Sequence, residues 1–195
     1  MREVVLDIET IPSGRAEWKA LVARAPFLQG KKREDSALDW SFGHVICISM
    51  IFRDKGRQRE RCLAGPEEAA LLRSFWAEVR PDDYLVGHNL LGFDLPFLQA
   101  RSVVCRVKPS RSFDLRKFSK ASVYDTMQVW ANWDRHKYPK LETLAAILGL
   151  EGKSGRGDLV AKWHEAQEWE RIKEYCLQDA RLARDIYLRM KQYGM

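Results

Sequence analysis

The chain has 195 residues, of which 46% are hydrophobic and 31% charged, and it carries a formal net charge of +6. This length suits one domain, or one domain with a generous insertion, and the composition excludes an intrinsically disordered chain. The sequence has no apolar run of about 18 residues that would predict a transmembrane helix. Carboxylates near the N-terminus argue against a secretory signal.

The cysteine spacing indicates the redox environment. The sequence has no Cys-x-x-Cys pair, and its four cysteines are Cys47, Cys62, Cys105 and Cys176. This spacing predicts reduced, mostly buried thiols rather than a zinc site or a disulfide framework. We therefore expect a cytoplasmic protein with no membrane partner.

The hydrophobic pattern predicts strands first and helices later along the chain. The predicted strands cover 3–9, 44–53, 57–63 and 84–87. The predicted helices cover 66–79, a stretch from Asp94 toward Arg101, a stretch starting near Asp125, 140–149 and 168–193. Residues 12–43 are irregular and suit an insertion or a lid. This order predicts an α/β or α+β domain with helices packed on a mixed sheet.

Positive charge is concentrated in residues 101–120, which hold a net charge of +6 against a single acid, Asp114. The basic residues are Arg101, Arg106, Lys108, Arg111, Arg116, Lys117 and Lys120. One interpretation is a loop that faces a polyanion, with Phe113 and Phe118 available to stack on bases. The other interpretation is a solvated, mobile loop, and the charge pattern alone leaves both open.

Two carboxylates interrupt the first predicted strand. Because side chains alternate along a strand, Asp7 and Glu9 share one face with Val5. Two acids at positions i and i+2 of a rigid strand suit a hard divalent cation, since unpaired buried carboxylates are costly. A strand end in solvent, or an arginine partner, would also explain them.

Two further acids occupy unusual positions. Asp179 lies within the apolar stripe of the last predicted helix, with Tyr175 one turn earlier on the same face. The alternative to a functional site is that Asp179 simply bonds to that tyrosine or to an arginine elsewhere. Asp94 follows a predicted strand end, where open α/β sheets place their sites, although it also suits an ordinary helix N-cap.

Together, four acids lie on or beside apolar elements: Asp7, Glu9, Asp94 and Asp179. Few obvious cationic partners accompany them at these positions, so they suggest a divalent metal centre. Oxygen ligands without a Cys/His set favour Mg²⁺ or Mn²⁺ over zinc.

Three segments, in order, resemble the motifs of the DEDD 3′–5′ exonucleases. Asp7-Ile8-Glu9-Thr10 resembles the first motif, 89–94 (Asn-Leu-Leu-Gly-Phe-Asp) the second, and 175–179 (Tyr-Cys-Leu-Gln-Asp) the third in its tyrosine form. The chain is most similar to the predicted exonucleases related to the proofreading domain of family B DNA polymerases. Segments 140–145 and 152–160 are also typical of that group.

The resemblance implies an α/β, RNase H-like fold, with a central mixed five-stranded sheet flanked by helices. Residues 1–195 would form a single exonuclease domain, with an insertion or lid at 12–43 and a basic loop at 101–120. Two divalent ions, Mg²⁺ or Mn²⁺, are implied as cofactors. Asp7 would bridge both ions, Glu9 and Asp179 would complete the ligands of the first, and Asp94 would hold the second.

The same resemblance implies catalytic and substrate-binding roles. Tyr175 would act with the four acids as a catalytic residue by orienting the attacking water. Thr10 and Ile11 would lie against the terminal nucleotide and Asn89 near the scissile end, with Phe93 as a further substrate contact. The charge pattern of the basic loop, rather than the resemblance, adds Arg111, Arg116 and Lys117 as predicted contacts. Lys153 is either a contact to a substrate phosphate or an ordinary surface lysine.

The expected activity is hydrolysis at the 3′ end of single-stranded nucleic acid, with release of nucleoside 5′-monophosphates. DNA is favoured over RNA as the substrate, although no motif here encodes a contact to the 2′-hydroxyl. The protein would act alone or with a polymerase or repair complex, in proofreading or DNA repair. Two alternatives stay open: a non-catalytic nucleic-acid-binding module of the same fold, and an RNase H-like endonuclease.

Overall fold

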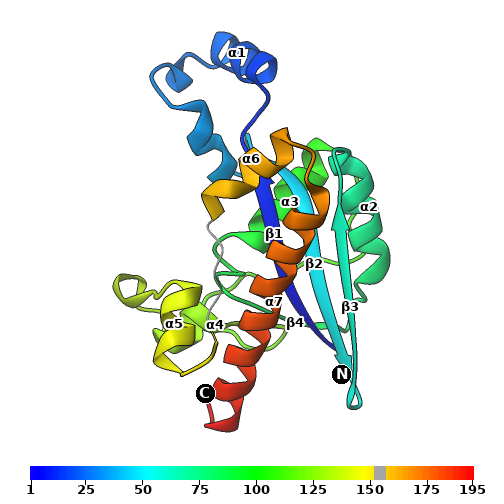
Figure 1. Ribbon diagram of the computed structural model, residues 1–195, viewed down its shortest axis with the longest axis vertical. Helices are drawn as coiled ribbons and strands as arrows, with labels where there is room; N and C mark the ends of the chain where they lie inside the picture. Colours follow the sequence, from blue (N-terminus) through cyan, green and yellow to red (C-terminus); the bar gives the residue numbers. More distant parts are fainter. Residues whose placement is uncertain (152–156) are drawn as a thin grey trace.

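The molecule is built around one mixed sheet (Figure 1). A computed structural model describes residues 1–151 and 157–195. The strands are β1 (Glu3–Ile11), β2 (His44–Asp54), β3 (Arg57–Ala64), β4 (Tyr84–Gly87) and β5 (Val123–Asp125). Their order is β3-β2-β1-β4-β5, with β1 antiparallel to β2 and parallel to β4. The α/β class and the mixed five-stranded sheet are therefore confirmed.

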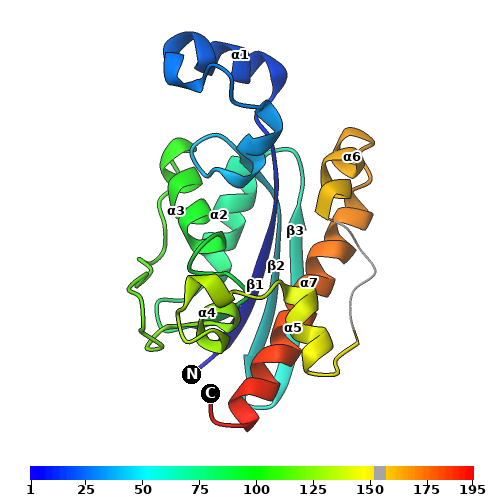
Figure 2. The same ribbon diagram turned by 90° about the vertical axis from the view of Figure 1, so that its left-hand side faces the viewer.

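Helices cover both faces of the sheet. Helices α2 (Glu68–Glu78) and α3 (Asp94–Val104) lie on one face, and the long α7 (Trp169–Gln192) crosses the other (Figure 2). The shorter helices are α4 (Thr126–Trp130), η3 (Arg135–Lys137), α5 (Leu141–Ile147), η4 (Gly157–Leu159) and α6 (Val160–Glu165). No helix in the described part of the chain is long and apolar enough to cross a membrane.

Alternation along β1 places its side chains in two different cores. Val4, Leu6 and Ile8 are buried against α2 and α3, whereas Val5 joins the core beneath α7. Each fully buried aliphatic side chain contributes about 1.5–3 kcal/mol, which fixes the register of the strand. The face shared by Asp7 and Glu9 is therefore the face that α7 covers.

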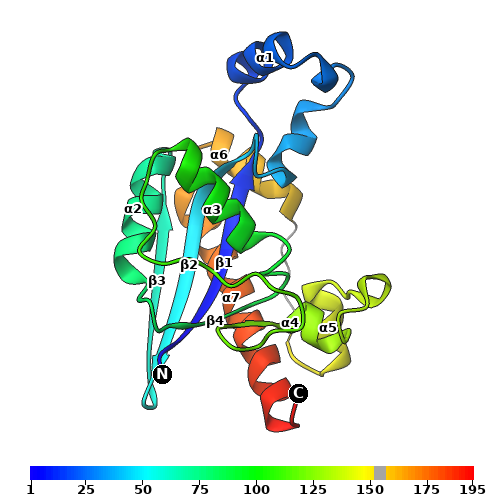
Figure 3. The same ribbon diagram turned by 180° about the vertical axis from the view of Figure 1, so that it is seen from behind.

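Several elements differ from the sequence predictions, which also missed α6. The segment 12–43 is not irregular throughout, because it contains α1 (Arg15–Arg24), η1 (Pro26–Leu28) and η2 (Arg33–Leu38). Helix α1 buries no residue and projects beyond the end of the sheet (Figure 3). Strand β5 was also missed, because only three residues precede α4.

The basic segment is more structured than a solvated loop. Its first residues belong to α3, and Arg101 is buried in an ion pair with Glu68 at 2.8 Å. Phe113 is also buried and stacks on Trp76, with ring centroids 5.2 Å apart. The expectation that Phe113 is available to bases is therefore wrong, whereas Phe118 is 69% exposed.

All four cysteines are free thiols. Cys47 and Cys176 are buried, and Cys62 and Cys105 are half-buried. Cys47 on β2 and Cys62 on β3 lie with their sulfur atoms 3.3 Å apart. The thiols therefore pack mainly where β2, β3 and α7 meet.

Candidate active site

Strand β1 and helix α7 meet where the first two acids lie. Ser49 on β2 pairs with Asp7 across the sheet, and its hydroxyl donates to the Cys176 carbonyl at 3.0 Å. The Cys176 thiol donates in turn to an Asp7 carboxylate oxygen at 3.5 Å. These contacts hold α7 against β1 beside Asp7. The register of β1 on β2 shifts between Glu9 and Thr10, which redirects the strand just after the two acids.

A thiol joins the two acids on β1. Ligand atoms of Asp7, Glu9 and Cys176 all lie within 4.8 Å of one another, a grouping able to hold a metal ion. Sequence reasoning missed Cys176, because a cysteine in an apolar helix stripe indicates an ordinary core residue. Its position directly after Tyr175 in the third motif was the available signal.

Asp94 reaches back to the same strand. It is the first residue of α3, and its carboxylate accepts a hydrogen bond from the Ile8 backbone N–H at 3.1 Å. Phe93, not Asp94, occupies the N-cap position, so the interpretation of Asp94 as a simple helix cap is wrong. The side chain is only 4% exposed and ties the start of α3 to the middle of β1.

Mutual repulsion marks these acids as neighbours. Burial raises the pKa of Asp94 well above its usual range, and the charges of Asp125 and Asp179 raise it further. Burial likewise raises the pKa of Tyr175, and the charges of Asp179, Glu9 and Asp7 raise it further. A divalent cation among these carboxylates would offset the repulsion, so the residues fit the implied metal ions.

The structure therefore brings the five predicted catalytic residues to one region. They come from β1, the start of α3 and the amino-terminal half of α7: Asp7, Glu9, Asp94, Tyr175 and Asp179. Tyr175 is buried and packs edge-on against Trp163 of α6, with centroids 5.6 Å apart. Helix α6 thus forms the outer side of this region.

Asp125 is a buried acid with a positioning role that the sequence did not reveal. Its carboxylate accepts hydrogen bonds from the backbone N–H groups of Asn89 at 3.1 Å and Leu91 at 2.9 Å. It also caps α4, as the sequence predicted for a helix starting near Asp125, by accepting from the N–H groups of Met127 and Gln128. One side chain thus holds the loop that leads to Asp94.

Loss of this carboxylate has a predictable cost. Asp125→Ala is expected to lower the free energy of unfolding by about 3 kcal/mol, because it removes a helix cap and leaves buried N–H groups unpaired. Urea denaturation measures this loss, and Asp125→Asn should recover part of it by keeping one acceptor oxygen. An Asp125→Ala variant as stable as the wild type would exclude the positioning role.

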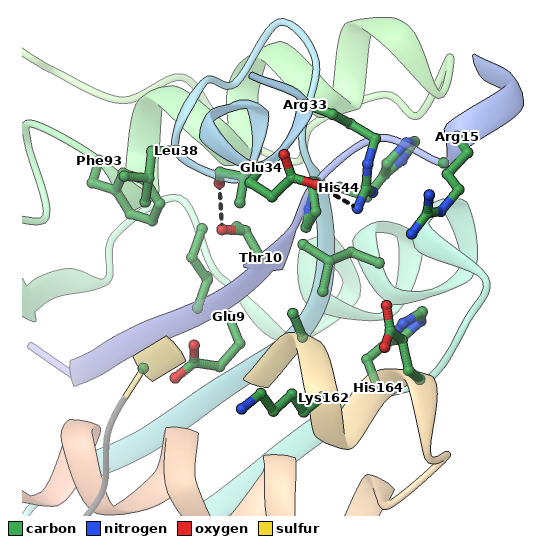
Figure 4. Close-up of a pocket in the computed structure, with 18 residues that line it drawn as sticks. Glu9, Thr10, Arg15, Arg33, Glu34, Leu38, His44, Phe93, Lys162 and His164 are labelled. Carbon is green, nitrogen blue, oxygen red and sulfur yellow. Dashed lines mark hydrogen bonds and ion pairs between the residues drawn. The ribbon is translucent and has the colours of Figure 1, made fainter. Parts of the chain in front are cut away.

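A cleft of about 860 Å³ opens beside Glu9 (Figure 4). Its floor is the end of β1, and its walls are the 12–43 segment and α6. Among the predicted substrate-binding residues, it is lined by Thr10, Ile11 and Phe93. The Thr10 hydroxyl donates to the Ala37 carbonyl at 2.6 Å, so the floor is tied to one wall. Asn89 lies in the loop before Phe93, with a backbone φ of 61° that asparagine tolerates.

The predicted basic contacts lie elsewhere. The Arg111 guanidinium donates to the carbonyls of Arg80 and Asp83, before the start of β4 and so at the opposite end of that strand from Asn89. Arg116 pairs with Asp114 at 2.7 Å, and neither Arg116 nor Lys117 lines the cleft. Lys153 lies outside the described residues.

The sheet order, with acids supplied by β1, α3 and α7, defines an RNase H-like nuclease fold. A family model for predicted 3′–5′ exonucleases related to the exonuclease domain of PolB matches residues 36–194, and the chain belongs to this family. The match includes Asp94, Tyr175 and Asp179, and β1 with Asp7 and Glu9 precedes it. A comparison with curated proteins finds no match.

Proposed function

We propose that the protein is a metal-dependent 3′–5′ exonuclease that removes nucleoside 5′-monophosphates from single-stranded nucleic acid. One observation carries the proposal: acids from three separate elements converge beside a cleft in a chain of this exonuclease family. The whole chain acts as a single domain, alone or with a polymerase or repair complex. DNA is the favoured substrate.

The acids would hold two divalent ions, Mg²⁺ or Mn²⁺. Bound ions of this kind lower the pKa of an attacking water and stabilise the leaving oxygen. Asp7 would contribute to both ions, Glu9 and Asp179 would complete the ligands of the first, and Asp94 would hold the second. The hydrogen bond from the Ile8 N–H fixes one Asp94 oxygen, so its carboxylate is oriented before any ion binds.

The end of β1 receives the terminal nucleotide. Thr10, Ile11 and Phe93 line the cleft next to Glu9, where an apolar surface suits a base. The ions that the acids would hold would face the scissile phosphate. Asn89 lies near the scissile end, on the loop that Asp125 holds. The tie between Thr10 and Ala37 keeps this surface in place.

Tyr175 orients the attacking water without acting as its base. Burial and the neighbouring acids raise the pKa of Tyr175, so the phenol stays neutral near pH 7.

Tyr175→Phe is expected to lower kcat by about 10- to 100-fold, because the variant loses one hydrogen bond to a charged group. KM and Mn²⁺ affinity should stay unchanged. Steady-state kinetics on a labelled oligonucleotide measure both constants, with Tyr193→Phe at the exposed C-terminus as control. Full kcat in Tyr175→Phe would exclude this role.

Product analysis tests the proposed reaction. Single-stranded DNA and RNA of equal length, each labelled at the 5′ end, are incubated with Mg²⁺, Mn²⁺ or EDTA. The expected result is a metal-dependent ladder that shortens from the 3′ end, with nucleoside 5′-monophosphates as the released product and DNA degraded faster. Cleavage of circular DNA would instead indicate an endonuclease, and binding without cleavage would indicate a non-catalytic module.

A further inference from the structure

The 12–43 segment builds one wall of the cleft. Arg15 at the start of α1, together with Arg33 and Leu38 of η2, faces the cleft from this segment. Lys162 lines it from α6, and Figure 4 shows this lysine on the other side of the β1 end from Arg33. Cationic groups therefore border the cleft on both sides.

The wall is held in place at several points. Arg33 donates to the Ser13 carbonyl at 2.9 Å, which closes the base of the segment. Glu17 on α1 pairs with His44 at the start of β2 at 2.7 Å. With the tie from Thr10 to Ala37, these contacts join the segment to two strands of the sheet. The backbone that carries the cationic side chains of the segment is thus anchored to the sheet next to the cleft.

The chemistry of the lining matches a nucleic-acid strand. Apolar side chains of Ile11, Leu38 and Phe93 line the cleft together with basic groups, and single-stranded nucleic acid presents bases to the former and phosphates to the latter. Three acids, Glu9, Glu34 and Glu165, also line the cleft, and Glu34 pairs with Arg33 at 2.9 Å. Arg15 and Lys162 are exposed at the rim, so they are the groups best placed to meet phosphates.

We propose that the 12–43 segment and α6 together form a subsite for the nucleic-acid strand on the 5′ side of the nucleotide being released. Arg15 and Lys162 contact backbone phosphates there, and Leu38 contacts a base. This subsite rests on the proposed function, because that function sets the end of the strand that reaches Glu9. It makes the 12–43 segment a determinant of affinity for longer substrates.

The test measures binding without cleavage. Affinity for a fluorescent single-stranded oligodeoxynucleotide is measured in EDTA over a range of salt concentrations. The double variant Arg15→Glu/Lys162→Glu is expected to bind at least about tenfold more weakly than the wild type. Its salt dependence, log Kd against log salt, should flatten by about 0.7 for each phosphate that the variant no longer neutralises.

A matched control removes the same charge outside the cleft. Lys19→Glu/Arg24→Glu changes two exposed residues of α1 that do not line the cleft, and it should bind like the wild type. Equal weakening in both double variants, or none in either, would overturn the subsite.

A separate experiment tests the proposed function: the wild type is incubated with Mn²⁺ and the p-nitrophenyl ester of thymidine 5′-monophosphate. Failure to hydrolyse this small phosphodiester counts against the proposed function, and the binding comparison still decides the subsite.

Discussion

Asp7→Ala is expected to abolish cleavage of a single-stranded 3′ end. Asp7 lies within 4.8 Å of the ligand atoms of Glu9 and Cys176, and its charge acts on Tyr175. Loss of the shared metal ligand proposed for Asp7 would remove several kcal/mol of transition-state stabilisation, so we expect a rate at least about a thousandfold lower. Initial rates with saturating Mn²⁺ measure the effect.

The same variant should stay folded. Removing one carboxylate from a cluster of like charges relieves repulsion, so the midpoint of thermal unfolding without metal should be unchanged or higher. Asp7→Asn keeps the shape of the side chain and should be equally inactive. Asp82→Ala, which removes an exposed acid, serves as the control with full activity. Full activity in Asp7→Ala would contradict the assignment of the metal centre.

Arg101→Ala is expected to produce the largest loss of stability. Arg101 is 3% exposed and donates to both carboxylate oxygens of Glu68, at 2.9 and 2.8 Å. His44 and the Val45 N–H bond the same carboxylate. Burial alone would raise the pKa of Glu68, but the bonds from His44 and Arg101 outweigh it and lower that pKa to about 2.

Alanine at position 101 leaves Glu68 buried without its main partner. A broken buried pair costs about 3–5 kcal/mol, which corresponds to a fall of about 6–20 °C in Tm for a chain of this size. Urea denaturation and thermal melting measure the loss. The control is Arg171→Ala, which breaks a surface pair with Glu168 and should change the free energy of unfolding by less than about 1 kcal/mol. Equal effects in the two variants would contradict a structural role for the buried pair.

The sequence predicted the face of a strand or helix on which a residue lies best, because local spacing alone decides that face. Alternation along residues 3–9 correctly separated Asp7 and Glu9 from the side chains that pack under α2 and α3. The stripe of the last helix likewise placed Tyr175 and Asp179 on its inner side. The burial of Tyr175 bears this out, since a helical face is set by local spacing alone.

Features set by long-range contacts were not predictable in this way. Arg101 looked like part of a polyanion-binding loop, and its partner Glu68 lies 33 residues away. Phe113 stacks on Trp76, and Asp125 bonds to the backbone of Asn89, only in the folded chain. The helices in the wall formed by residues 12–43 were also missed, and α1 buries no residue against the rest of the fold.

Direct measurement of metal binding tests the central claim, that acids from β1, α3 and α7 form one metal centre. Mn²⁺ is titrated into the wild type, Asp7→Asn and Asp94→Asn, and free Mn²⁺ is followed by electron paramagnetic resonance. The wild type is expected to bind two ions, Asp94→Asn to lose one, and Asp7→Asn to lose high-affinity binding. Absence of saturable binding in the wild type, or identical titrations in all three proteins, would contradict the metal centre.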